Sequence, residues 1–226
     1  MKFALNTLFD FFLPRFCPGC NKKLSSKEQP VCSECISSIL IADDFRLQFE
    51  YDKKFATEKI IKDFYARYVF ETDKTLQDII HALKYKKQFK LGTFLGEILS
   101  EGVMNLNWQF DLIVPVPIHP LKKAERGYNQ SDYIVKGLSK SLDIPYSTKL
   151  LKRTKHTESQ THLSMTERAK NVANAFKVKN PELIKGKSFM LVDDVITTGA
   201  TTQECGRALV SSGAKTVYAC SVGIAE

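Results

Sequence analysis

Four cysteines near the start of the chain form the first pattern that could do chemistry. They stand as Cys17-Pro-Gly-Cys20 and Cys32-Ser-Glu-Cys35, two Cys-x-x-Cys pairs separated by eleven residues. This spacing is typical of structural zinc sites, in which four thiolates surround one ion and leave no coordination position open. We therefore expect structural zinc, with four unligated thiols or two disulfides as the alternatives. Cys205 and Cys220 stand alone, which indicates buried small apolar residues.

The second pattern runs from Phe189 to Thr201, where an apolar segment leads into two carboxylates and a threonine-rich turn. A buried strand, this turn and a helix beginning near Thr202 would cradle a phosphate dianion with backbone N–H groups and hydroxyls. The carboxylates would then meet ribose hydroxyls or hold Mg²⁺ through water. A generic phosphate-binding turn is the simpler alternative. The candidate ligand-binding residues here are Asp193, Asp194, Val195, Ile196, Thr197, Thr198, Gly199, Ala200, Thr201 and Thr202.

The elements that must position these residues can be read from the hydrophobic pattern. Strands are expected at 64–70, 110–116, 144–151, 175–178, 188–192 and 216–222, and helices at 72–87, 90–104, 131–142 and 202–211. Strands that alternate with helices predict an α/β fold with a mostly parallel sheet flanked by helices. We expect an N-terminal helix and zinc module over 1–42, followed by the α/β domain over 43–226. Residues 3–13 have helical apolar spacing, which favours packing on the rest of the chain, with a membrane or partner surface as the alternative.

Composition narrows the class of protein. The chain has 226 residues, of which 43% are hydrophobic and 26% charged, so collagen-like, disordered and many-span membrane proteins are excluded. The formal net charge of +8 suits a polyanionic partner such as nucleic acid, a phosphate-rich ligand or an acidic membrane. No small-residue cleavage site comes after the apolar start, and the cysteine usage is not that of a secreted framework. A cytoplasmic protein is expected.

Basic clusters on this background are candidate contacts for nucleic acid. Residues 84–90 interleave four lysines with two aromatic side chains, a mixture that suits single-stranded DNA because phosphates meet ammonium groups while bases stack on rings. Solvated protein surface is the alternative for each cluster. The candidate DNA-binding residues are Lys84, Lys86, Lys87, Lys90, Lys122, Lys123 and Arg126.

The stretch from 189 to 201 resembles the 5-phosphoribosyl 1-diphosphate (PRPP) signature of the type I phosphoribosyltransferases. A wider order of motifs resembles the ComF family, competence proteins of bacterial DNA uptake built on that fold. The resemblance implies binding of PRPP with Mg²⁺, handling of single-stranded DNA in natural transformation, and contact with other DNA-uptake proteins at the inner membrane, to which the protein would be peripheral. The motifs are the two cysteine pairs, Leu83-Lys-Tyr85, Val114–Pro120, Arg126–Gln130, Leu151–Thr154 with Gln160, Arg168 with Asn171, and the PRPP signature.

The same resemblance implies two further parts of a site. Val116 and Pro117 would belong to the loop on the pyrophosphate side, although the prolines also suit a plain strand-ending turn. Residues 153–168 correspond to a loop that closes over substrate, in which the candidate catalytic cations Arg153, Lys155 and Arg168 would neutralise leaving pyrophosphate. A solvated polar loop is the alternative there.

The family pattern is incomplete in one respect. Only 24 residues come after Thr202, so a base-recognising hood would have to come from about residues 55–105. Whether the protein transfers phosphoribose is therefore open. Two alternatives remain beside the DNA-uptake role: an active phosphoribosyltransferase of nucleotide salvage, and a PRPP-sensing regulator that binds DNA.

Overall fold

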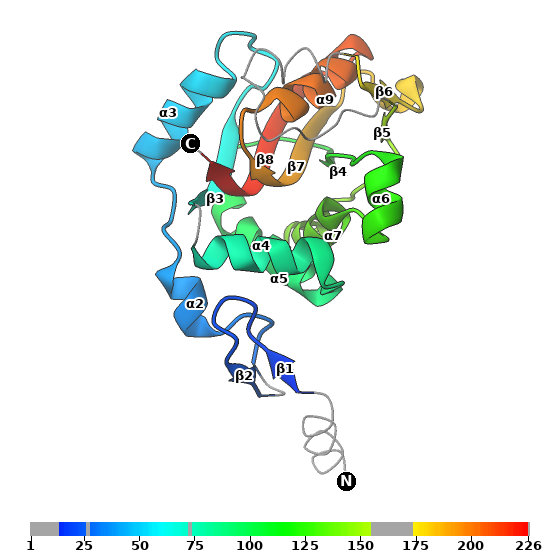
Figure 1. The fold of residues 1–226 in the computed structure, drawn as a ribbon. Helices are drawn as coiled ribbons and strands as arrows, with labels where there is room; N and C mark the ends of the chain where they lie inside the picture. The colour runs from blue at the N-terminus through cyan, green and yellow to red at the C-terminus, as the bar shows by residue number, and fades with distance from the viewer. Residues whose placement is uncertain (1–13, 26–27, 72–73, 155–173, 226) are drawn as a thin grey trace.

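A four-stranded parallel sheet forms the centre of the computed structural model, which describes residues 14–25, 28–71, 74–154 and 174–225. The strand order is β3 (Phe64–Phe70), β8 (Thr216–Ala225), β7 (Ser188–Ile196) and β4 (Leu112–Pro115), and every pairing is parallel. The carboxyl ends of the strands therefore meet at one edge, where open α/β sheets bind ligands (Figure 1). The expected α/β class with a mostly parallel sheet is confirmed.

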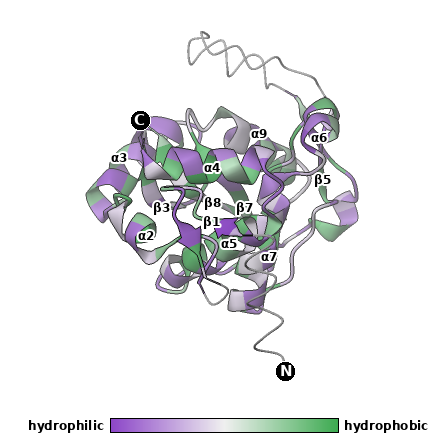
Figure 2. Ribbon diagram, turned by 60° about the horizontal axis from the view of Figure 1, so that its bottom comes forward, coloured by the Kyte–Doolittle hydropathy of each residue, from purple (hydrophilic) through white to green (hydrophobic). Residues whose placement is uncertain are grey.

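Helices cover both faces of this sheet because its central strands are apolar on both sides. Met190 and Val192 of β7 join a core cluster with α4 (Thr75–Tyr85), α5 (Phe89–Val103) and α7 (Gln130–Leu142). Phe189 and Leu191, which alternate with them, join a second cluster with α9 (Ala200–Ser211). The α4 ribbon in Figure 2 carries both green and purple segments, as a helix with one buried face should.

Two glycines let α5 and α7 pack at close range. A Cβ atom at Gly96 would collide with the carbonyl oxygen of Ile134, and one at Gly137 would collide with that of Thr93. The helix backbones are therefore in direct contact. This close packing fixes the beginning of α7, which carries side chains of the candidate site.

The N-terminal cysteine region packs directly on α4. It consists of the antiparallel pair β1 (Arg15–Phe16) and β2 (Lys23–Leu24), with α2 (Ser33–Ser38) after them. Cys17, Cys32 and Cys35 belong to the same core cluster as the buried face of α4, and a Cβ at Gly19 would lie 2.7 Å from Cγ2 of Thr75. The predicted apolar helix at 3–13 lies outside the described residues.

Residues between the cysteine region and the helical layer contribute to the sheet itself. Helix α3 (Asp44–Lys54), capped by Asp43, precedes β3, and six residues of β3 pair with β8. The range 55–105, the expected source of any hood, supplies β3, α4 and α5 to the sheet and one of its helical layers.

The fold has three smaller elements besides the sheet and its helices: α6 (Pro120–Arg126), the hairpin of β5 (Leu151–Arg153) and β6 (Phe176–Val178), and the 3-10 turn η1 (Pro181–Leu183).

The prediction of a strand at 144–151 is wrong. Before β5 begins, this segment forms only an isolated bridge, from Tyr146 to Ile113. Pro145 lacks the N–H that a central strand donates.

The helices in the described part of the chain include none with the length and apolar character of a membrane span.

Candidate functional site

Two adjacent aspartates near the carboxyl end of β7 form the centre of the site. Asp193 Oδ1 accepts a hydrogen bond from Ser131 Oγ of α7 at 3.2 Å. Asp194 Oδ2 lies 2.9 Å from Lys84 Nζ at the end of α4, and Asp194 Oδ1 accepts from the backbone N–H of Val195 at 2.8 Å. Elements from different parts of the chain thus hold each carboxylate in a fixed direction.

The two carboxyls have opposite electrostatic environments. Burial and the neighbouring negative charge of Asp194 raise the pKa of Asp193 to about 8. Burial also acts to raise the pKa of Asp194, but the Lys84 ammonium and the N–H of Val195 outweigh it, so the pKa is lowered. The pair therefore carries one proton and one negative charge near neutral pH, with Asp194 the ionised partner.

The turn after β7 leads directly into α9. Gly199, the N-cap residue, has a left-handed φ of 76° and offers no side-chain acceptor to the helix. The positive end of the α9 dipole therefore faces the turn formed by Thr197 and Thr198, as a phosphate-binding helix terminus requires. Thr197 is exposed, Thr198 is half-buried, and Thr202 in the first turn of the helix is buried. The helix begins at Ala200, two residues earlier than expected.

The loop after β4 lies beside the acidic pair. The N–H of Val116 donates to the carbonyl of Val192 at 2.8 Å, one residue before Asp193. The carbonyl of Val116 accepts from Nδ2 of Asn129, the N-cap residue of α7, at 3.0 Å. Pro117 is the next residue. The structure therefore brings the predicted residues of both loops to the same strand ends.

Cations surround this edge of the sheet. Burial lowers the pKa of Lys122, and the positive charges of Arg126, Arg153 and Lys84 lower it further, so all three lie within electrostatic reach of Lys122. Arg153 also interacts electrostatically with Asp193 and packs over the ring of Phe176 at 5.5 Å. A cluster of four positive charges beside a buried acidic pair suits a polyphosphate that bridges the two.

Of the other predicted DNA-binding and catalytic residues, those within the described part of the chain do not contact the acidic pair. Lys86, Lys87 and Lys90 are exposed around the turn between α4 and α5, on the side of the cysteine region. Lys123 is exposed, 3.8 Å from the carboxylate of Asp132. Lys155 and Arg168 lie outside the described residues, so only Arg153 of the three predicted catalytic cations is placed.

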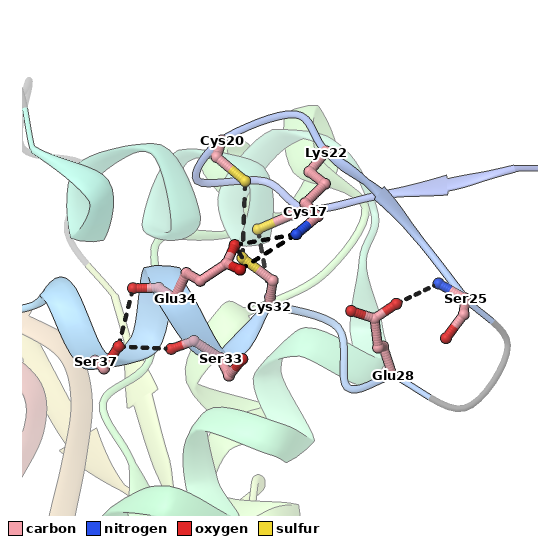
Figure 3. Close-up of polar contacts among 9 residues, drawn as sticks. All are labelled: Cys17, Cys20, Lys22, Ser25, Glu28, Cys32, Ser33, Glu34 and Ser37. Carbon is pink, nitrogen blue, oxygen red and sulfur yellow. Dashed lines mark hydrogen bonds and ion pairs between the residues drawn. The ribbon is translucent and has the colours of Figure 1, made fainter.

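The four N-terminal cysteines converge as their spacing predicts. Their Sγ atoms all lie within 4.8 Å of one another. Figure 3 shows three of the four, Cys17, Cys20 and Cys32, and Cys20 Sγ lies 3.7 Å from Cys32 Sγ. A tetrahedral ion with metal–sulfur distances of about 2.3 Å separates its ligands by about 3.8 Å. The cysteines are free rather than disulfide-bonded. This geometry fits one metal ion. Cys205 and Cys220, both fully buried in the main body, lie outside the cluster, as predicted.

Backbone N–H groups stabilise the thiolate form of Cys17, one of the four cysteines. Burial acts to raise the pKa of Cys17, but backbone N–H groups of Cys32, Cys20 and Gly19 outweigh it and lower the pKa to about 7. The Cys32 N–H donates to Cys17 Sγ at 3.4 Å. At the rim, Lys22 pairs with Glu34 at 3.2 Å.

Comparison with known proteins places this site in a family. The phosphoribosyl transferase domain matches residues 81–225. Competence protein F of Haemophilus influenzae is 30% identical over 212 residues, covering 89% of this chain and 86% of its own. The chain belongs to the ComF family. Competence protein ComFC of Streptococcus pneumoniae is 30% identical over 89% of this chain and 77% of its own.

Other ComF relatives match a shorter region. The DNA utilization protein YhgH of Shigella flexneri is 33% identical over 63% of this chain and 64% of its own length. Among solved structures, the glutamine PRPP amidotransferase of B. subtilis is similar with a TM-score of 0.43 and 18% identity, over 62% of this chain and 30% of its own.

Sequence reasoning missed two side chains of this ComF site. Ser131 orients Asp193, and Asn129 holds the carbonyl of Val116. Both belong to the N-terminus of α7 just after the turn at Gly127, where Asn at the N-cap is a recognisable signal. Lys84 was predicted from its neighbours as a DNA contact, whereas its ammonium is paired with Asp194.

Proposed function

We propose that this ComF protein acts in competence-type DNA handling. It would bind PRPP, or a related ribose 5-phosphate, at the β7–α9 turn and single-stranded DNA on its basic surface. The observation that carries the ligand proposal is the acidic pair on β7, with a glycine-capped helix N-terminus directly after it. The names of the relatives, which refer to competence and to DNA utilization, support the biological role.

The proposed fit assigns each part of PRPP to a group on the chain. The 5-phosphate would bind the backbone of Thr197–Gly199 at the α9 dipole. Asp194, kept ionised by Lys84, would accept hydrogen bonds from the ribose hydroxyls, while the protonated Asp193 would donate one. Mg²⁺ would supply charge neutralisation for the pyrophosphate and meet the aspartates through water, because Lys84 already neutralises Asp194.

Zinc is the metal we propose for the cysteine cluster. Four thiolates at tetrahedral spacing favour Zn²⁺, which needs no redox chemistry and no open position. Because the cysteines belong to the core cluster shared with α4, the ion would stabilise the packing of residues 15–38 on the main body.

Transfer of phosphoribose is the second candidate, and the cations around the acidic pair favour it. In that reaction the bond from the ribose C1 to pyrophosphate breaks and pyrophosphate leaves with the bonding electrons, while an acceptor nitrogen forms the new bond to C1 with its lone pair and releases its proton to solvent. Arg153 interacts electrostatically with Asp193 and Lys122, and both cations would stabilise the charge that develops on the leaving group.

One purified sample tests these functions together. PRPP and an oligodeoxynucleotide are titrated by calorimetry, and pyrophosphate release is measured with a panel of bases. Binding of both ligands without turnover supports the DNA-handling role. Release of pyrophosphate with one particular base supports the transferase instead. Binding to one duplex sequence only would indicate a regulator, whereas strongly salt-dependent, sequence-independent binding would argue against one.

A further inference from the structure

A groove between the cysteine region and the turn joining α4 to α5 combines positive charge with exposed aromatic surface. It encloses about 650 Å³ and is lined by β1 on one side and by residues 86–91 on the other. Its cations are Arg15, Lys86, Lys87 and Lys90, and no Asp or Glu is among the described residues that line it. A polyanion would therefore enter without repulsion from the walls of the groove.

Two phenylalanines give this groove stacking surfaces. Phe16 of β1 is 46% exposed and Phe89 at the start of α5 is 40% exposed, and both line it. Phe89 stacks on Tyr133 with ring centroids 4.7 Å apart and meets Tyr128 edge-on at 4.9 Å. Its ring is therefore held in place before any ligand arrives, so binding costs little side-chain entropy.

The backbone of the groove is also fixed. Lys87 adopts a left-handed φ of 52°, which is unfavourable for a residue with a Cβ atom. The Tyr128 hydroxyl donates to the carbonyl of Leu83, which ties the segment just before α7 to the end of α4, next to this turn. The lysines are thus presented from a defined turn.

We infer that this groove is the track for single-stranded nucleic acid. Sugar-phosphates would contact the four cations, and bases would stack on Phe16 and Phe89. The inference rests on the proposed binding of single-stranded DNA and assigns it a surface. It also separates the predicted DNA contacts, because Lys84 is paired with Asp194, and Lys122 and Arg126 do not line the groove.

The test compares two triple variants with the same loss of charge in the full chain. The groove variant is Lys86→Gln, Lys87→Gln and Lys90→Gln. The control is Lys179→Gln, Lys185→Gln and Lys187→Gln, which removes three exposed lysines outside the groove. Oligothymidylate of about 20 nucleotides is titrated over a range of salt concentrations. We expect the groove variant to reduce the slope of log affinity against log salt by about 2, and the control to leave it nearly unchanged.

A third variant, Phe89→Leu, tests stacking without changing the charge. It should weaken oligothymidylate binding about tenfold at constant salt slope. Equal losses in both triple variants would overturn the groove while leaving DNA binding itself intact. Absence of binding by the unmodified chain would overturn DNA binding and the groove together. If the groove variant lost affinity only for vesicles of phosphatidylglycerol and phosphatidylcholine, the groove would be a membrane contact and the inference would be wrong.

Discussion

The ammonium of Lys84 lies 2.9 Å from the carboxylate of Asp194, joining the end of α4 to the end of β7. The site thus contains its own positive charge, which keeps one member of a buried acidic pair ionised and leaves the other protonated. The buried face of the same helix shares a core cluster with three of the four N-terminal cysteines. Helix α4 therefore contacts both the cysteine region and the acidic pair.

Removing this ammonium should destabilise the fold. In Lys84→Met the carboxylate of Asp194 stays buried without its cation, which should lower the free energy of unfolding by about 3 kcal/mol in urea titrations near neutral pH. Lys140→Met is the control, because Lys140 pairs with Glu97 at 2.9 Å on the surface, and its loss should cost less than about 1 kcal/mol. Equal costs would show that the Lys84 pair contributes no more than a surface contact.

The protonated state of Asp193 predicts a pH dependence of stability. Its folded pKa of about 8 lies above the ordinary value of 3.8, so the folded chain holds a proton that the unfolded chain has released between these values. Its contribution to stability is therefore fully present below pH 4 and is lost as the pH rises toward 8. The slope is at most about 1.4 kcal/mol per pH unit.

Asp193→Asn isolates this effect. The amide resembles the protonated acid, so the variant should lose less stability than the unmodified chain when urea unfolding is compared at pH 5.5 and 7.5. The four histidines are present in both proteins, so their titration cancels in the comparison. Parallel pH profiles would mean that Asp193 is already ionised in the folded protein.

Gly199 should be sensitive to a single added methyl group. A Cβ there would lie 3.0 Å from Cε1 of Phe55 and 3.2 Å from Cβ of Lys54, at a left-handed φ. Gly186 has a similar φ of 71° but no atom within 4 Å. Gly186→Ala should therefore cost only about 1 kcal/mol in thermal or urea unfolding. Gly199→Ala should cost more and should also weaken PRPP binding, whereas matching effects would mean that the turn tolerates the methyl group.

Loss of one thiolate should release the metal. Cys17→Ser and Cys32→Ser should each contain less zinc by elemental analysis and unfold at lower temperature, because the proposed ion would contribute to the packing of the cysteine region. Cys220→Ala, at a buried cysteine outside the cluster, should keep the metal. Full zinc content in both serine variants would contradict the four-thiolate site.

The sequence predicted most of the sheet because its strands are continuous apolar runs. It missed the end of β7, where two charged residues favour a loop. The strand continues to Ile196 because β8 supplies backbone partners, with Asp193 opposite Ser221 and Val195 opposite Gly223. The ion pair between Lys84 and Asp194 could not be predicted from the sequence either. A lysine beside Tyr85 and Lys86 has the local pattern of an exposed basic face, and only the folded sheet brings its ammonium to a carboxylate.

The cysteine cluster and the β7–α9 turn were predictable because each depends on residues close together in the sequence. The spacing of two Cys-x-x-Cys pairs is typical of a four-thiolate site, and their four Sγ atoms do lie together. The surrounding groups come from distant elements: Ser131 from α7, Lys122 and Arg126 from α6, and Arg153 from β5. Their positions could not be predicted, because no local sequence pattern indicates which strand ends lie next to each other in the folded sheet.

Calorimetric titration of PRPP with Mg²⁺ into the unmodified chain and into Asp194→Asn tests the central claim most directly. Asp111→Asn is the control, because Asp111 accepts a hydrogen bond from the Ser188 N–H at the opposite end of β7. We predict binding to the unmodified chain and to the control, and an affinity at least about tenfold weaker for Asp194→Asn, as expected when a charged hydrogen-bond acceptor is lost. Equal affinity in all three proteins, or no binding to the unmodified chain, would contradict the assignment of the acidic pair to a ribose phosphate.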